Sequence, residues 1–343
     1  MIRETEVAAV TLIGKKHESR GIVCEDSSIA IKKNGVSFVC VSDGAGGKQY
    51  THAKLGSAKI TEVLSDFFTE NFDTLYAENR EAAVKNLIMT KIRIAFADLM
   101  KENELSSLEQ LSATMLFCAV KDRRMMVGHI GDGLICKVSS SGVSPITMPQ
   151  NDNAGHTFFV TASRAEDYLR FIKTTTDDIH AVCLMSDGVA DSVYDENSGL
   201  VKPVMTAMAD TLAKGRENAE ESLKQIIGDY IVGKSNVSDD ASFAVIFFEN
   251  TKGPDKQSLS QSEEAFPIVS EDKFKALQAS MKDDVLRSRE ILTGSVPSKP
   301  VEKEKPNDTP ETQKGFSYKI YSIFVTILLL IAVIVFCVLK FCI

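Results

Sequence analysis

The sequence predicts an α+β fold in which two packed sheets carry helices on their outer faces. Two observations lead to this prediction: short β-rich runs follow one another in the chain, and the helical segments come in pairs. A third observation adds a separate element, because residues 320–339 form an uncharged apolar run near the C-terminus. The predicted architecture is an α+β domain followed by a transmembrane helix.

Composition and alternation locate the predicted strands, which cover 7–13, 28–31, 36–41, 113–120, 125–130, 134–138, 157–161, 181–185 and 243–248. The runs between 113 and 138 are separated by polar turns such as Lys121-Asp122-Arg123-Arg124, which is typical of an antiparallel meander. Apolar residues at helical spacing predict helices over 52–69, 80–101, 204–213 and 219–231.

Composition excludes several classes of protein. The 343 residues, 44% hydrophobic and 25% charged, fit a globular domain with appendages. A formal net charge of −8 argues against a nucleic-acid partner, since binding to phosphates requires a basic face. None of the 7 cysteines forms a Cys-x-x-Cys pair and most lie in apolar runs, so they indicate reduced core residues of a cytosolic domain.

The composition changes after residue 250. Residues 251–316 are rich in Lys, Glu, Ser and Pro, which predicts a linker between a domain over 1–250 and the C-terminal segment. Within the linker, residues 270–293 begin with a serine N-cap and carry apolar residues at helical spacing, so an amphipathic helix is expected. Such a stripe usually faces a core, which favours packing on the preceding domain; a docking or oligomerisation helix is the alternative.

The apolar run has the length that a helix needs to cross a bilayer, about 20 residues. Only Lys340-Phe341-Cys342-Ile343 follows it, so residues 317–343 are predicted to be a tail anchor. Lys314 and Lys319 precede the run and favour a cytoplasmic location for the rest of the chain, although Lys340 lies on the other side. The expected localisation is a single-pass membrane protein with residues 1–250 in the cytoplasm.

Four aspartates stand at the ends of predicted strands: Asp26 in Cys24-Glu25-Asp26-Ser27, Asp43 in Ser42-Asp43-Gly44-Ala45-Gly46, Asp187 in Ser186-Asp187-Gly188, and Asp239 in Asp239-Asp240-Ala241-Ser242. Carboxylates at the mouths of buried strands can bring distant segments to one point, and hard divalent cations require clustered carboxylate oxygens. Each aspartate alone is compatible with a turn or cap residue. Together, in these contexts, they favour a two-metal hydrolytic site.

Six motifs occur in order over about residues 8–248. They are Gly14-x-x-His17-x-x-x-Gly21-x-x-Cys24-Glu25-Asp26, residues 42–46, His129-Ile130-Gly131-Asp132-Gly133, residues 155–161, residues 186–189 and residues 239–242. With these motifs the chain resembles the metal-dependent type 2C serine/threonine protein phosphatases, and in particular their bacterial subgroup. The linker and the apolar tail lie outside the resemblance.

The resemblance implies a four-layer α-β-β-α sandwich of two antiparallel sheets, with two Mn²⁺ or Mg²⁺ ions at its edge and a weaker third site. Two such cations lower the pKa of a water molecule between them and hold the phosphoryl oxygens, so no protein nucleophile is needed. By position, the metal ligands would be Asp26 (through water), Asp43 (bridging), Gly44 (through its carbonyl), Asp187 and Asp239. The third site would consist of Asp132, Asp187 and Asp191.

Two positions depart from the family pattern. Where eukaryotic members have a candidate general-acid histidine, this chain has Ala45, and His52 is a substitute only by its nearness in sequence. Where an arginine often binds the substrate phosphate, this chain has Gly21, with Arg20 beside it. A guanidinium suits a phosphate, so Arg20 joins Asp43 and Asp26 as an expected catalytic residue, with a solvated turn as its alternative role. His17 is either near the site or structural.

The function implied by the resemblance is hydrolysis of phosphoserine and phosphothreonine monoesters in proteins. The expected partners are phosphorylated proteins, a cognate Ser/Thr kinase and the membrane. The alternative is a catalytically weak or dead homologue that acts as a membrane-tethered phosphoprotein-binding or scaffolding module. The complete carboxylate set favours the enzyme, because clustered acids repel one another without a cation. The missing histidine and displaced arginine keep the alternative open.

Overall fold

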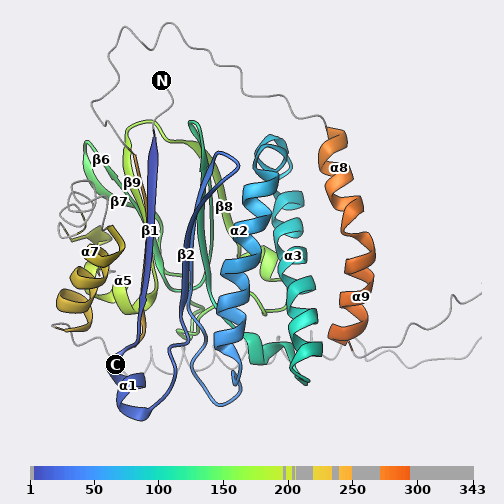
Figure 1. Ribbon diagram of the computed structural model, residues 1–343, viewed down its shortest axis with the longest axis horizontal. Coiled ribbons are helices and arrows are strands. Elements are labelled where there is room, and N and C mark those ends of the chain that lie inside the picture. The colour runs from blue at the N-terminus through green and yellow to red at the C-terminus, as the bar shows by residue number, and fades with distance from the viewer. Residues whose placement is uncertain are drawn as a thin grey trace, which may run out of the picture. The chain divides into compact units, whose positions relative to one another are not determined.

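The computed structural model describes residues 4–195, 198–202, 205, 219–233, 239–248 and 271–293. All of them belong to the first of two compact units, Met1–Pro297, while the second unit is Ser298–Ile343. Within the first unit, two five-stranded antiparallel sheets lie side by side with helices on their outer faces (Figure 1). The predicted α+β fold with two antiparallel sheets is therefore confirmed.

The first sheet has the strand order β2 (Ser27–Lys33), β3 (Val36–Ser42), β4 (Met115–Lys121), β5 (Arg124–Ile130) and β8 (Arg170–Thr175). The second sheet has the order β1 (Thr5–Leu12), β12 (Ala241–Phe248), β9 (Ile179–Met185), β6 (Leu134–Ser139) and β7 (Gly142–Thr147). A short hairpin joins β10 (Tyr194–Asp195) to β11 (Leu200–Val201). Strands β3, β5 and β12 are buried along their whole length, because both faces of each sheet are covered.

Helices α2 (Ala53–Ala77) and α3 (Glu81–Glu102) cover the first sheet. Helices α5 (Asp187–Val193) and α7 (Ala219–Ile226), with a π-helical continuation over Ile227–Val232, cover the second sheet. Shorter pieces are α1 (Lys15–Arg20), a 3₁₀ helix η1 (Leu108–Leu111) and α4 (Ala165–Tyr168).

Three apolar interfaces hold the layers together. Between α2 and the first sheet, the Phe68 ring lies 4.5 Å from that of Phe117 and 5.7 Å from that of Phe38, measured between centroids. Val41 and Leu184 belong to the interface between the two sheets. The third interface lies between the second sheet and α5 and α7. The layers are thus helix, sheet, sheet and helix.

Residues 271–293 form two helices, α8 (Glu271–Ser280) and α9 (Lys282–Thr293), with a break at Met281. Phe274 and Met281 are buried in the same apolar cluster as residues of α2 and α3, and Arg287 of α9 lies 3.4 Å from Asp98 of α3. One face of this helix pair therefore packs on the helix layer of the first sheet, outside α3 (Figure 1).

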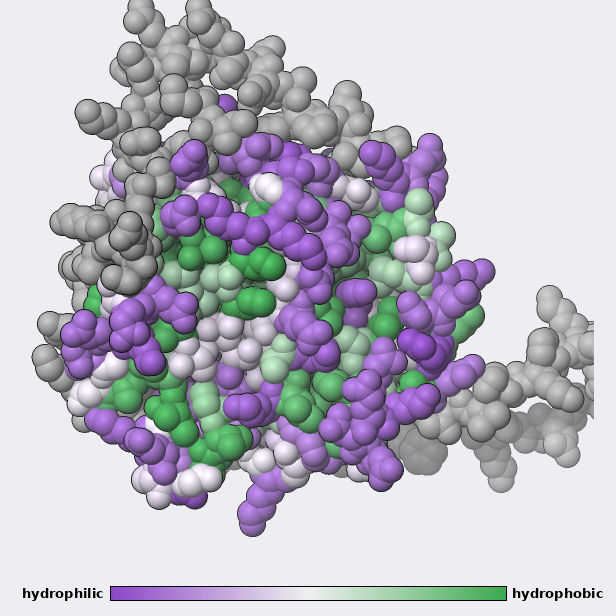
Figure 2. All heavy atoms as spheres, viewed as in Figure 1, coloured by the Kyte–Doolittle hydropathy of each residue, from purple (hydrophilic) through white to green (hydrophobic). Residues whose placement is uncertain are grey.

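On the side of the molecule that Figure 2 shows, hydrophilic side chains alternate with hydrophobic ones over α2. Two ion pairs lie at the surface of this helix: Lys33–Asp66 (3.0 Å), which joins β2 to α2, and Lys59–Glu62 (2.7 Å) within α2. Exposed pairs of this kind contribute little to stability, and they mark the solvated side of an amphipathic helix.

The predicted strand over 157–161 is wrong. Thr157 forms only an isolated bridge with Asn151, and the following residues lie in a loop. The Phe158 ring stacks on Tyr168 at 4.1 Å, and the Val160 amide donates to the Ala113 carbonyl at 3.1 Å. The aromatic run therefore packs its partly buried side chains from a loop. The predicted helix over 204–213 lies, apart from Met205, outside the described residues.

Among the described residues, no helix is both long enough and apolar enough to cross a membrane. The predicted span over 320–339 lies outside those residues.

Candidate metal centre

Asp43 stands directly after the buried strand β3. Its amide donates to Thr114 Oγ1 at 2.9 Å, and its carbonyl accepts from the Thr114 amide at 2.8 Å. The next residue, Gly44, is so close to the neighbouring segment that an added Cβ would lie 2.6 Å from the Glu25 carbonyl oxygen. The sheet and this close approach therefore fix Asp43 beside the segment that carries Glu25.

Two further aspartates converge on Asp43. Asp132 lies in the tight turn between β5 and β6, and the Thr157 hydroxyl donates to its carboxylate. Asp187 is the first residue of α5, after β9. One carboxylate oxygen from each of Asp43, Asp132 and Asp187 lies within 4.8 Å of the others. Three strand ends thus bring three acids within coordination distance of one cation.

Asp26 lies beside this group, just before β2. It is buried, and its Oδ2 atom has no hydrogen-bond partner among the described residues. Burial raises the pKa of Asp26 to about 6, against the opposing influence of nearby Asp43 and the Ser242 and Ser186 hydroxyls. A buried carboxylate oxygen without a donor is destabilising unless a cation or its water satisfies it.

The other three acids have raised pKa values for the same main reason. Burial, reinforced by Asp132, raises the pKa of Asp187 to about 7. Burial followed by repulsion from Asp26 and Asp187 raises the pKa of Asp43 well above its ordinary value, and burial also raises that of Asp132. Because hard oxygen ligands are those that Mn²⁺ and Mg²⁺ accept, this donor set fits a divalent cation, whose charge would offset the repulsion.

The remaining predicted residues are less closely grouped. Asp239 precedes β12; its carboxylate lies 3.6 Å from Lys16 Nζ, and its charge contributes to the raised pKa values of Asp132 and Asp187. Asp191 is exposed on α5, one turn after Asp187. Arg20 is exposed at the end of α1. Neither Asp191 nor Arg20 belongs to the group of three converging acids.

Sequence reasoning missed the role of Asp240. This residue is 3% exposed, and its carboxylate accepts from the Gly14 amide (2.7 Å), the Glu25 amide (2.7 Å) and His17 Nδ1 (2.9 Å). Asp240 therefore ties both ends of the α1 loop, residues 14–25, to the start of β12. The only signal in the sequence is the Asp-Asp pair, whose members have separate roles.

Both descriptions left open for His17 apply, because the ring supports the α1 loop and also lies near Asp239. The ring is buried and bonded to Asp240 through Nδ1, while Nε2 lies 3.8 Å from an Asp239 oxygen. His17 therefore supports the α1 loop. His52 Nδ1 lies 2.8 Å from the Thr51 hydroxyl at the start of α2, and Ala45 is buried beside η1.

A close approach fixes Asp187 in turn. A Cβ added to Gly188 would lie 2.0 Å from the Asp240 carbonyl oxygen, so only glycine fits here. Ser186 and Ser242 are joined by two hydrogen bonds, of 3.0 Å and 2.9 Å. The ends of β9 and β12 are thus locked together beneath the acids.

Comparisons with known proteins agree with this geometry. A family model described as protein phosphatase 2C matches residues 13–228. The chain therefore belongs to the protein phosphatase 2C family, whose members are metal-dependent serine/threonine protein phosphatases. A comparison with curated protein sequences gave no match.

Solved structures of similar fold include a bacterial serine phosphatase, with 16% identity, a TM-score of 0.52 and coverage of 74% of this chain and 100% of the other. The catalytic domain of the serine/threonine phosphatase PstP, solved with two manganese ions, has 16% identity, a TM-score of 0.51 and coverage of 73% and 100%. PppA of Pseudomonas aeruginosa has 12% identity, a TM-score of 0.51 and coverage of 72% and 99%. At these identities the likeness concerns the fold alone.

Proposed function

We propose that this protein removes phosphate from phosphoserine and phosphothreonine in proteins, using a pair of Mn²⁺ or Mg²⁺ ions to activate water. The observation that carries the proposal is the convergence of Asp43, Asp132 and Asp187, with the unpartnered oxygen of Asp26 beside them. Family membership supports the same reaction. The scaffolding alternative is not favoured, because the acids a catalytic centre needs are present and clustered.

The proposed ligands of the two ions are the Asp43 carboxylate, the Gly44 carbonyl, Asp187 and Asp239, with Asp26 acting through water. Asp132, Asp187 and Asp191 are assigned to a weaker third site. When bound, the cations would lower the pKa of a coordinated water and neutralise charge on the phosphoryl group. No protein nucleophile is then required.

The chain's own side chains orient the reactants. Thr157 fixes the direction of the Asp132 carboxylate, and Asp240 holds the loop that carries Arg20. The exposed Arg20 guanidinium is proposed to bind the substrate phosphate, for which its planar fork of donors is suited. Because the position of the usual histidine is taken by Ala45, protonation of the leaving group is assigned to water.

The experiment is phosphate release from phosphoserine and phosphothreonine peptides by the full chain, with Mn²⁺ or with EDTA. Turnover is expected only with metal, and Asp43→Asn should reduce it by about 100-fold or more. The matched control is Asp66→Asn, which changes an exposed carboxylate on α2 and should leave turnover unchanged. If the wild-type protein binds the phosphopeptides but releases no phosphate with any metal ion, the result would favour the scaffolding alternative.

The proposal extends to the cellular setting. Residues 320–339 are proposed to anchor the protein in a membrane, with residues 1–250 in the cytoplasm and a Ser/Thr kinase supplying the substrates. The uncharged run of spanning length supports the anchor, and the proline-rich composition of 294–316 supports a tether before it.

A further inference from the structure

The helix pair α8–α9 has an outer face that the phosphatase chemistry does not use. The two helices lie outside residues 13–228, which the family model matches. Phe274, Met281 and Ser288 are buried at intervals of seven residues, so one seam of the pair packs inward. Among the described residues, nothing packs over the stripe beside this seam.

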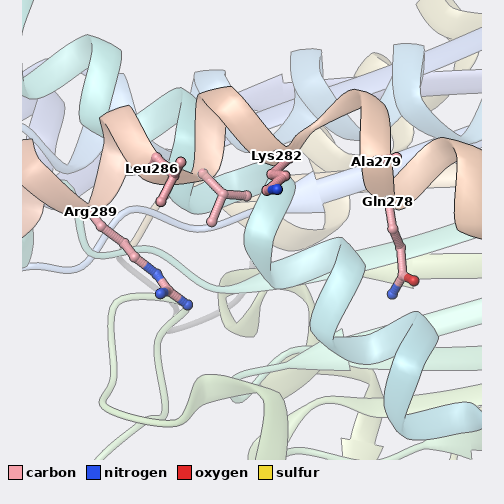
Figure 3. A pocket seen from close by; sticks show the side chains of 6 residues that line it. Gln278, Ala279, Lys282, Leu286 and Arg289 are labelled. Carbon is pink, nitrogen blue, oxygen red and sulfur yellow. The ribbon is translucent and has the colours of Figure 1, made fainter. Parts of the chain in front are cut away.

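An open groove of about 430 Å³ follows that stripe. Its lining residues are Gln278, Ala279, Lys282, Val285, Leu286 and Arg289 (Figure 3). Leu286 is 52% exposed and lies along the helix between Lys282 and Arg289 (Figure 3). An exposed leucine between two cations can make apolar contact with a partner whose flanking residues are acidic.

The two cations of the groove have no side-chain partner among the described residues. Neither the Lys282 side chain nor the Arg289 side chain has an ion pair or hydrogen bond with any residue that the structure describes, and none of the six lining side chains is a carboxylate. Arg287 differs, because it lies 3.4 Å from both Asp98 and Asp284. Within the described part of the chain, the unpaired positive charge of α9 thus lies on its groove side.

The spacing of these residues suits a helical partner. Lys282 and Arg289 are seven residues apart on α9, which is about 10 Å along the helix, or two turns. A partner helix with acidic residues at positions i and i+7 and an apolar residue between them would pair both cations and cover Leu286.

We propose that the α8–α9 groove docks an acidic amphipathic helix of a partner protein. An anionic bilayer fits less well, because membrane-binding segments carry clusters of about four to eight cations, and this groove has two. Docking itself does not depend on the phosphatase activity. If the proposed function holds, a phosphorylated segment of the same partner would gain effective concentration at the metal centre.

The test is selection from a displayed library of helical peptides on the full-length protein, with counter-selection on the double variant Lys282→Glu/Arg289→Glu. We expect enriched peptides with acidic residues seven positions apart around a leucine-like residue. A synthetic peptide of the enriched sequence should bind the wild type about tenfold more tightly than it binds the double variant or Leu286→Gln. Its binding should weaken as salt is added.

Lys273→Glu is the matched control, because Lys273 is an exposed cation of α8 outside the groove lining. This variant should bind the peptide like the wild type, and circular dichroism should show that all variants fold. Peptides without acidic enrichment, or peptides that the double variant retains equally, overturn the proposal. If the wild type binds phosphatidylglycerol vesicles but not phosphatidylcholine vesicles, and the double variant loses this binding, the groove would be assigned to a membrane instead.

Discussion

At Asp26 and Asp187, burial has consequences for stability that can be measured without substrate. The pKa values of these carboxyls are raised to about 6 and about 7, above the value of about 3.9 in an unfolded chain. At pH values between the unfolded-state pKa and the folded-state pKa, the folded state binds more protons than the unfolded state. The free energy of unfolding therefore falls as the pH rises. The stabilising contribution of the two protonated carboxyls is complete below about pH 4 and has been lost once the pH has risen past about 7.

We therefore expect urea unfolding of the metal-free protein to show lower stability at pH 8 than at pH 5. Mn²⁺ should reverse the trend, because it binds the deprotonated carboxylates and stabilises the folded state more at pH 8. Stability in EDTA that rises from pH 5 to pH 8 would contradict the picture of buried, mutually repelling acids.

A hydroxyl chain leads from Thr11 to Asp26. Thr11 Oγ1 lies 2.8 Å from Ser28 Oγ and 2.8 Å from Ser242 Oγ, and the Ser242 hydroxyl lies near the Asp26 carboxylate. We predict that Thr11→Val keeps the fold but weakens Mn²⁺ binding by about 10-fold, because outer residues orient metal ligands.

Calorimetric titration of Mn²⁺ checks this prediction. Thr5→Val is the control, since Thr5 is on the same strand and its hydroxyl lies 2.6 Å from that of Ser37, in a different pair. Equal Mn²⁺ affinities of the two variants would show that Thr11 has no positioning role.

At the scale of elements, Asp239 and Asp240 should separate metal binding from folding. Asp240→Ala leaves three donors of the α1 loop without their acceptor and should cost about 3 kcal/mol or more in unfolding free energy. Asp239→Asn leaves these bonds in place, so it should have little effect on stability. It should lower the Mn²⁺ affinity, because it removes a proposed ligand.

Urea unfolding in EDTA, with hydrogen exchange at the Gly14 and Glu25 amides, distinguishes the two variants. Faster exchange at both amides is expected in Asp240→Ala alone. If Asp239→Asn frees the same amides, the two aspartates do not have separate roles.

Uniform burial makes a strand easy to predict from the sequence. β3 and β12 are continuous apolar runs, and they were predicted because a strand covered on both faces needs such a run. β7 was missed because it contains Pro145, which is tolerated on this edge strand. The run over 157–161 has strand composition, but its side chains pack from a loop, and that depends on Tyr168 and Ala113.

In the candidate site, too, some residues could be predicted from local sequence and others could not. Asp26, Asp43 and Asp187 could be predicted because each stands at a strand end in a recognisable context. The supporting role of Asp240 depends on the amides of Gly14 and Glu25, more than 200 residues away in the chain, and no local pattern reports such a contact. The structure brings Asp43, Asp132 and Asp187 together, but the ligand roles of all the named aspartates and of Gly44 stay predictions, as does the phosphate-binding role of Arg20.

At the scale of the whole molecule, we predict that deletion of residues 317–343 releases a soluble enzyme with unchanged turnover on small phosphopeptides. The physical reason is that the deleted segment includes the whole uncharged run, whereas the acids of the metal centre lie in the first compact unit. Membrane fractionation with an alkaline carbonate wash checks the prediction. A truncated protein that still sediments with membranes, or that loses turnover on soluble peptides, would show that the tail does more than anchor.

Hydrolysis at a pair of cations is tested most directly by Mn²⁺ titration of the EDTA-stripped full chain, with bound Mn²⁺ and phosphopeptide turnover measured on the same samples. We predict that turnover is absent without metal, rises as two Mn²⁺ ions bind per chain, and disappears together with tight Mn²⁺ binding in Asp43→Asn. Full turnover in the stripped protein, or Mn²⁺-dependent turnover that Asp43→Asn retains, would contradict the assignment of the catalytic centre.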